Sequence, residues 1–355
     1  MRLSILSLLL MSTSALAAPP SGPHNLAPIC TAAAAGAPSH AQRKCVSPHR
    51  IWMPGTATAT WEDKLVVMLP GTDMEPNKHD TIGQIAAKAG FRTILLGYDN
   101  RHEHVGPGSA GISGFCVDEF PGDTSCAGDV ADTVLWGPTA SPPVAGLNYD
   151  DEDSVEARLI SALDRLHVQD MLDGTNDYGF DGYSTDVQAG NWCNIIVAGF
   201  SQGSTVTGVL ASQVDLGGAV MFDGPAGMTD VGGVPTAQDW RTGPHATDGS
   251  VMFGAYHNLK TFAPEDAWDD LGLPAGTDTV RQLLPFTWGV PAGIHRVEAF
   301  QAVPAGAPGI CSNHMSMARD NCMPMAPGTS KPILFDAYTT FFEEAGAGMD
   351  PDCAP

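Results

Sequence analysis

The pentapeptide Gly199-Phe200-Ser201-Gln202-Gly203 is the part of the sequence best suited to covalent chemistry. A serine hydroxyl is a weak nucleophile, so it needs a sharply turned, exposed position beside a base and near N–H groups that can stabilise an oxyanion. Glycines two positions before and after the serine leave room for such a turn, because they carry no Cβ atom. The spacing therefore predicts that Ser201 is a nucleophile.

The segments around this motif predict the order strand, tight turn, helix that such a serine requires. The apolar run 195–198 predicts a strand before the turn, and a helix-compatible stretch after it continues to about Val214. Continuous apolar runs of this kind are typical of parallel strands buried on both faces. Further strands are predicted at 64–69, 91–96, 219–222, 251–253 and 296–300, and helices at 80–89, where Asp80 is the expected cap, at 154–167 and around 333–344.

This alternation of strands and helices predicts an α/β fold with a mostly parallel central sheet and helices on both faces. The chain has 355 residues and 43% of them are hydrophobic, which is enough for one large core. No internal repeat or linker divides it. We expect a single domain over residues 18–355, with loop insertions near 100–148 and 229–248.

In these features the chain resembles the α/β-hydrolase superfamily, and in particular secreted bacterial serine esterases and lipases. The form Gly-x-Ser-Gln-Gly is similar to the nucleophile elbow of cutinases, and the resemblance extends over roughly residues 60–345. It implies that Ser201 attacks an ester, and that the N–H of Gln202 and a second donor at Thr72, with its hydroxyl adding to it, form the oxyanion hole. Other positions that look like a group of bacterial extracellular hydrolases are Cys116, Cys126, Asn191, Trp192, Trp268 and 271–273.

The resemblance also implies a histidine base in a loop after the last strand. Two histidines are candidates, His295 and His314. His295 precedes the final predicted strand and so falls at the wrong end of a parallel sheet, whereas His314 lies beyond the other end. We expect His314 to be the base, in a loop held by a disulfide between Cys311 and Cys322.

The acid that orients the histidine is predicted less directly. In the superfamily it usually follows the strand at 251–253, but the residues there, 256–260, include no carboxylate. Asp223 follows the preceding strand, as in lipases of the pancreatic type, and is our first candidate. Glu265 and Asp266 are the alternatives, because the loop before them could fold back.

The amino terminus and the cysteines predict an oxidising compartment. Met1-Arg2, a short apolar run and Ala15-Leu16-Ala17 have the pattern of a signal peptide over residues 1–17, which predicts a secreted or periplasmic protein. All eight cysteines lie beyond it, so disulfides are expected. Proximity along the chain suggests the pairs Cys30–Cys45, Cys116–Cys126 and Cys311–Cys322, which leaves Cys193 for Cys353.

Charge and motifs exclude several other classes of function. The formal net charge is −23, which disfavours binding to nucleic acids and to anionic membranes, and no membrane anchor is expected. No Walker loop or dinucleotide fingerprint is present, so no cofactor is predicted. No metal site is predicted either: 102–104 and the acidic stretches 150–153 and 173–181 lack an accepted ligand spacing, and surface charge is the simpler interpretation of the acidic ones.

The sequence therefore predicts a serine hydrolase of carboxylic esters that works through a triad of Ser201, His314 and Asp223, with an ester as its only predicted partner. Two rival functions stay open. One is a serine peptidase on the same fold. The other is a non-catalytic extracellular binding protein, which the missing carboxylate after strand 251–253 favours.

Overall fold

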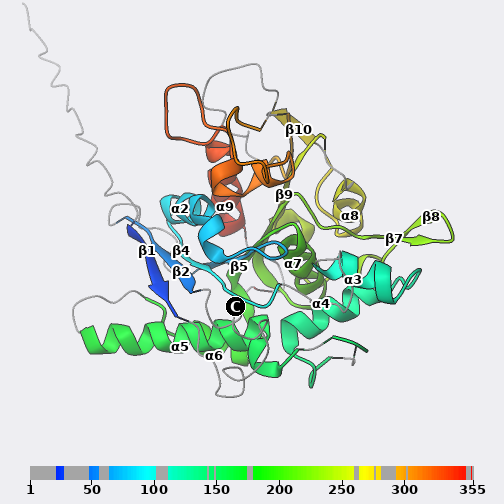
Figure 1. Cartoon of the computed structure of the whole chain (residues 1–355). Helices are drawn as coiled ribbons and strands as arrows, with labels where there is room; N and C mark the ends of the chain where they lie inside the picture. Colours follow the sequence, from blue (N-terminus) through cyan, green and yellow to red (C-terminus); the bar gives the residue numbers. More distant parts are fainter. Residues whose placement is uncertain are drawn as a thin grey trace, which may run out of the picture.

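The central feature of the computed structural model is one large sheet whose strands follow the order β1-β2-β4-β3-β5-β6-β9-β11-β10 (Figure 1). The structure describes residues 21–27, 48–55, 64–100, 111–141, 144–147, 149–173, 179–259, 264–275, 277–280, 293–300, 303–348 and 353. The strands are β1 (Ser21–Leu26), β2 (His49–Met53), β3 (Leu65–Leu69), β4 (Arg92–Leu95), β5 (Trp192–Phe200), β6 (Leu216–Phe222), β9 (Met252–His257), β10 (Thr277–Val280) and β11 (Arg296–Ala299). At one edge β1 pairs antiparallel with β2, and β2 pairs antiparallel with β4; all other neighbours are parallel.

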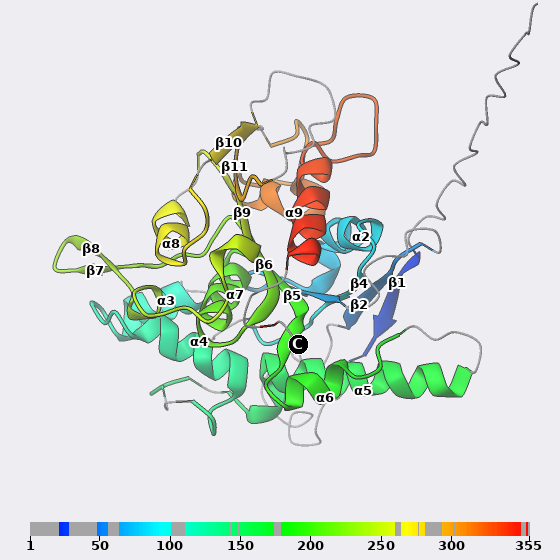
Figure 2. The same cartoon turned by 180° about the vertical axis from the view of Figure 1, so that it is seen from behind.

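The inner strands are apolar throughout because both of their faces are covered. In β3, Leu65, Val67 and Leu69 belong to the core on one face, whereas Val66 and Met68 belong to the core on the other. Helices α4 (Cys126–Trp136), α5 (Val155–Asp173) and α7 (Gln202–Gln213) pack on the first face, and α2 (Asp80–Lys88) and α9 (Phe335–Ala347) pack on the second (Figures 1 and 2). This arrangement confirms the predicted α/β-hydrolase fold class, a mostly parallel sheet with helices on both faces.

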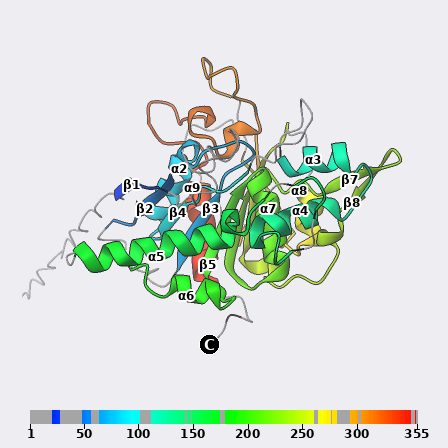
Figure 3. The same cartoon turned by 60° about the horizontal axis from the view of Figure 1, so that its bottom comes forward.

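The remaining elements lie in the connections. Helices α3 (Gly111–Glu119), α6 (Tyr183–Gln188) and α8 (Pro264–Asp270) add residues to the first core. A hairpin of β7 (Met228–Val231) and β8 (Val234–Ala237) reaches out from the body, as Figures 2 and 3 show. Short 3₁₀ helices occur at Pro76–Lys78, Asp151–Asp153, Asp239–Arg241, Gly249–Val251, Met315–Met317 and Asp320–Cys322.

The region 100–148, predicted from its Gly and Pro content as a loop insertion, is largely helical where the structure describes it. Val130, Val134 and Leu135 of α4 are fully buried in the first core. The described part of this region therefore belongs to the helical layer that covers the first face of the sheet. Helix α5 is also longer than predicted and continues to Asp173.

Three disulfides form as the sequence predicted, Cys116–Cys126, Cys193–Cys353 and Cys311–Cys322. The fourth predicted pair, Cys30–Cys45, lies outside the described residues, as do the predicted signal peptide and residues 102–104. In the part of the chain that the structure describes, no helix is long and apolar enough to cross a membrane.

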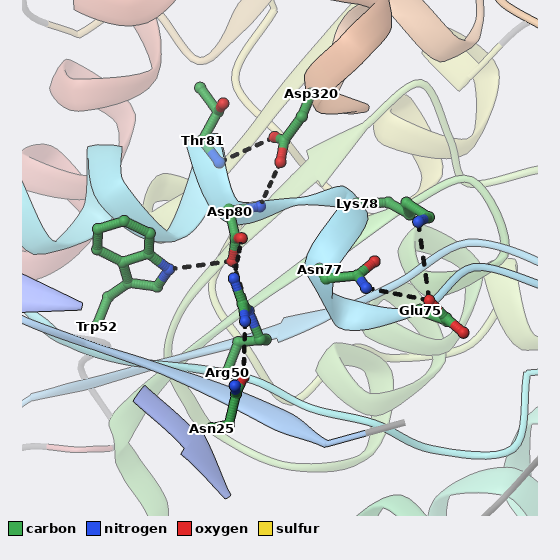
Figure 4. A network of polar contacts seen from close by, with 9 residues as sticks. All are labelled: Asn25, Arg50, Trp52, Glu75, Asn77, Lys78, Asp80, Thr81 and Asp320. Atoms are coloured by element: carbon green, nitrogen blue, oxygen red, sulfur yellow. Dashed lines mark hydrogen bonds and ion pairs between the residues drawn. The ribbon is translucent and has the colours of Figure 1, made fainter. Parts of the chain in front are cut away.

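The amino end of α2 is capped differently from the prediction, and the prediction that Asp80 caps it is wrong. The side chain of Asp320, which lies far along the chain, accepts hydrogen bonds from the N–H groups of Asp80 and Thr81 at 3.0 and 2.9 Å (Figure 4). Asp80 is the first helical residue, and its carboxylate binds Arg50 of β2. The cap thus ties the loop after β11 to α2 and to the edge of the sheet.

Candidate active site

Ser201 lies on the turn between β5 and α7, in a backbone conformation that serine rarely adopts. Its φ is +56° and its ψ is −115°. The Ser201 N–H donates to the carbonyl of Phe222 at 3.0 Å, and the N–H of Thr205 donates to the Ser201 carbonyl at 3.2 Å, so bonds on both sides hold the turn. The predicted order of strand, tight turn and helix is present.

The two glycines of the pentapeptide are required by space. A Cβ atom on Gly203 would lie 2.0 Å from the carbonyl oxygen of Leu69, and one on Gly199 would lie 2.2 Å from the carbonyl oxygen of Gly203. Both distances are far below van der Waals contact. The glycines therefore let α7 approach the end of β3, which brings the turn close to the loop that follows β3.

Asp223 follows β6 directly and lies at the same edge of the sheet as Ser201. The residue is 2% exposed and also has a positive φ, +47°. One carboxylate oxygen is hydrogen-bonded to Nδ1 of His314, and the other accepts the N–H of His257 at 3.1 Å. Both oxygens of this buried carboxylate thus have a donor.

His314 lies in the loop between β11 and α9, opposite the end of β6. Its ring packs against Phe200, the residue before Ser201, with the ring centroids 4.7 Å apart. The side chain is 21% exposed. The disulfide Cys311–Cys322 and the contact of Asp320 with α2 hold this loop on both sides of the histidine. The structure therefore brings together His314 and Asp223 beside the turn that carries Ser201.

The other candidates for base and acid lie elsewhere. His295 precedes β11, stacks on Phe253 at 4.6 Å, and its Nδ1 is 2.9 Å from the carbonyl of Met252, at the amino end of β9. Glu265 and Asp266 lie in the first turn of α8, where Glu265 is hydrogen-bonded to the hydroxyl of Tyr256. Strand β9 supplies no acid, but its last residue, His257, donates its N–H to Asp223.

The loop after β3 approaches the serine closely, as an oxyanion loop must. A Cβ atom on Gly71 would lie 3.2 Å from Cβ of Ser201. The side chain of Asn100 holds this loop, because its amide donates to the carbonyls of Gly71 and Met74, both at 2.7 Å. The Thr72 hydroxyl donates to Oε1 of Gln202 at 2.8 Å. The contribution of this hydroxyl to an oxyanion hole stays a prediction, and the Thr72 N–H is the other candidate donor.

A small pocket opens beside these groups. It has a volume of about 100 Å³ and is lined by Ser201, Gln202, Thr72 and Asp223 together with Ile112, Ser113 and Ala226. The walls are therefore made by the start of α3 and the turn after β6.

The sequence analysis missed three contributions to this site: the N–H of His257, the side chain of Asn100, and the side chain of Gln202. Each depends on which chain segments meet in three dimensions. The place of His257 at the end of a strand marks its side chain as a candidate for the site, but it gives no sign that the backbone N–H takes part. Among the described residues, no group of three or more His, Cys, Asp or Glu side chains could hold a metal ion.

Comparison with known proteins gives matches among solved structures, all of those named below at low identity. No protein-family model matches the sequence, and no curated protein matches it. Among solved structures, the chain is similar to a protein from Klebsiella pneumoniae subsp. pneumoniae assigned as a dienelactone hydrolase, with 13% identity and a TM-score of 0.31 over 72% of this chain and 80% of that one. It is also similar to an acetyl xylan esterase from Aspergillus awamori (12% identity, TM-score 0.27, 61% and 68% covered). A third is a phospholipase/carboxylesterase from Dyadobacter fermentans (12% identity, TM-score 0.25, 71% and 88% covered). At such identities, the activity of this chain has to be inferred from its own residues.

Proposed function

We propose that this protein is a secreted serine hydrolase that cleaves carboxylic esters, with Ser201 as nucleophile, His314 as base and Asp223 as the acid that orients it. The observation that carries the proposal is the hydrogen bond between the buried Asp223 carboxylate and His314 at the carboxyl edge of the sheet, beside a serine held at positive φ. A strained serine next to an oriented histidine is what nucleophilic catalysis by serine requires.

In the proposed reaction, Nε2 of His314 takes the proton of Ser201 as its Oγ attacks the acyl carbonyl. The N–H groups of Gln202 and Thr72 donate to the oxyanion of the tetrahedral intermediate. When the intermediate collapses, His314 gives the proton to the departing alcohol and an acyl enzyme is left. Water, activated by His314, then attacks the acyl carbon, and the acid leaves as Ser201 regains its proton.

Asp223 supports both states of the histidine. It accepts the Nδ1–H of neutral His314, which leaves Nε2 free to accept the serine proton, and it stabilises the imidazolium that forms. The N–H of His257 keeps the carboxylate in place for this contact.

The pocket size supports a short acyl group. Its volume of about 100 Å³ corresponds to about three water molecules, at the roughly 30 Å³ that each takes up in the liquid. The wall residues Ser113 and Ala226 are small, so a larger side chain would shorten the space further. We expect esters of short acids to react faster than those of long acids, and Ala226→Leu to increase this preference.

The amino terminus and the cysteines support the proposed compartment. The pattern of residues 1–17 indicates secretion, and three disulfides among the described residues are stable in an oxidising environment. The expected location is the periplasm or the medium. A cell fractionation with the full-length chain tests this, and retention in a reducing compartment would contradict it.

Labelling of the purified protein by a fluorophosphonate probe tests the proposed chemistry. We expect one label per chain in the wild type, no label in Ser201→Ala, and normal labelling in Ser212→Ala, a matched control on the same helix. Turnover of p-nitrophenyl acetate should follow the label. Absence of label in the folded wild type would favour a binding protein, and hydrolysis of peptide amides faster than esters would favour a peptidase.

A further inference from the structure

The side chain of Gln202 faces the oxyanion loop and is almost fully buried, with 6% exposed. Its Oε1 accepts the Thr72 hydroxyl at 2.8 Å and the backbone N–H of Ile112 at 3.2 Å. A backbone N–H can only donate, so the atom that faces Ile112 has to be the amide oxygen. The orientation of the carboxamide is thus fixed, and the Thr72 hydroxyl has to be the donor to it.

The amide nitrogen of Gln202 then faces Tyr98. The Tyr98 hydroxyl donates to the carbonyl of Pro70 at 2.8 Å. Burial raises the pKa of Tyr98 far above its usual range, so the phenol keeps this proton. The hydrogen bond with Gln202 acts in the opposite direction and offsets part of this rise, as expected of a group that donates to the phenol oxygen. Tyr98 therefore accepts from Gln202 and donates to Pro70.

These bonds form one chain whose direction is set by backbone groups at its two ends, the N–H of Ile112 and the C=O of Pro70. The chain holds the oxyanion loop at two places, Pro70 and Thr72, on either side of Gly71. The start of α3 packs closely against the same groups: a Cβ atom on Gly111 would lie only 2.4 Å from Oγ1 of Thr72 and 2.5 Å from Oε1 of Gln202.

We infer that the carboxamide of Gln202 is a positioning group: it fixes the N–H of Thr72 where the oxyanion forms and ties the pocket wall at Ile112 to the same point. The inference rests on the proposed function and adds a role that is separate from the backbone N–H of Gln202. A donor held at the oxyanion position acts on the transition state more than on the bound ester. Loss of its support should therefore lower kcat and change KM little.

Gln202→Met tests this directly, because methionine keeps the backbone N–H and a similar length but cannot make the three bonds. We expect kcat for p-nitrophenyl acetate to fall roughly 10- to 100-fold, somewhat less than the loss of a whole oxyanion donor, with KM within about threefold. Gln213→Met is the matched control. It lies at the other end of α7 and also bonds two side chains, Trp136 and Asp132, and its kcat should match the wild type.

Gln202→Glu gives a readout that a purely structural role would not move. A protonated carboxyl group has one accepting oxygen for Thr72 and Ile112 and one O–H that can donate to Tyr98, as the amide does. A carboxylate has no donor, so Tyr98 would have to turn from Pro70 towards it. We expect the ratio of the Gln202→Glu kcat to the wild-type kcat to fall as pH rises through the pKa of the new carboxyl, and the Gln202→Met ratio to stay flat. Any pH dependence that the variants share with the wild type cancels in both ratios.

Thr72 provides a second test if the Gln202 variants fail to fold. Thr72→Ser keeps the donor and should retain near-normal kcat, whereas Thr72→Val should lose as much as Gln202→Met, and the double variant should be no worse than either single one. A Gln202→Met kcat within twofold of the wild type, a flat Gln202→Glu ratio, or additive losses in the double variant would each overturn the positioning role. If the wild type takes up no fluorophosphonate, the proposed function fails as well; if Ser201 is labelled and these variants are normal, only the positioning role fails.

Discussion

Replacing Asp223 by asparagine should abolish most of the turnover through a change of histidine tautomer. The N–H of His257 donates to one oxygen of Asp223, so an asparagine at this position has to place its own oxygen there. Its NH₂ group then faces Nδ1 of His314. Because NH₂ can only donate, His314 has to leave Nδ1 unprotonated and carry its proton on Nε2, the atom that should accept the proton of Ser201.

The expected loss is large, because the wrong tautomer is enforced by a backbone group and the imidazolium loses its counter-charge. We expect kcat to fall roughly 10³- to 10⁴-fold, with little change in KM. This is about 4 to 5.5 kcal/mol of transition-state stabilisation. The fold should be unaffected, because asparagine tolerates a φ near the +47° of Asp223 as well as aspartate does.

The assay is steady-state hydrolysis of p-nitrophenyl acetate, with thermal unfolding measured on each variant. Glu265→Gln and Asp266→Asn are the controls for loss of one carboxylate at the competing position, and each should cost less than about tenfold, because these residues lie in the first turn of α8. Near-normal turnover by Asp223→Asn, together with a large loss in either control, would refute the assignment of the acid.

Two further predictions concern stability. Removing the Cys193–Cys353 bridge should lower the unfolding free energy more than removing the Cys116–Cys126 bridge, because it closes a span of 160 residues instead of 10. Loop entropy gives a loss of about 5 kcal/mol for the first bridge and about 3 kcal/mol for the second. Chemical denaturation of the two double Cys→Ser variants measures this difference. Burial lowers the pKa of His79 from 6.5 to about 4. The unfolded chain therefore binds a proton between these pH values that the folded chain does not, so stability should fall by on the order of 3 kcal/mol as pH drops through this window, and less in His79→Gln.

The fold could be predicted from the sequence because its strands carry a strong signal. Runs such as Leu65–Leu69 are apolar at every position, which only a strand covered on both faces requires. The region of α3 and α4 gave no such signal. Its glycines and the Cys116–Cys126 pair suggest a loop closed by a disulfide. The side chains through which α4 packs into the core are recognisable only when the neighbouring α7 is in place.

The candidate site was predictable where position along a strand determines position in space. Ser201, Asp223 and His314 follow the ends of parallel strands, and these ends meet at one edge of the sheet. Contacts between distant segments gave no sequence signal. Asp320 caps α2 from 240 residues away, although Asp80 looks like the local cap. The partners of Gln202 come from the loop after β3, the loop after β4 and the start of α3.

The backbone strain of the described chain coincides with this edge of the sheet. Among the described residues, the ones other than glycine with positive φ are Asp73, Ser201 and Asp223, which follow β3, β5 and β6. Such conformations cost on the order of 1–3 kcal/mol each and persist only where surrounding bonds enforce them. Here the N–H of Ser201 is bonded to the strand beside it, and that of Asp223 to Ala255 of β9, 2.7 Å away. The sheet thus holds Ser201 and Asp223 through their neighbouring strands, and this is why the two residues keep a common geometry although they are distant in sequence.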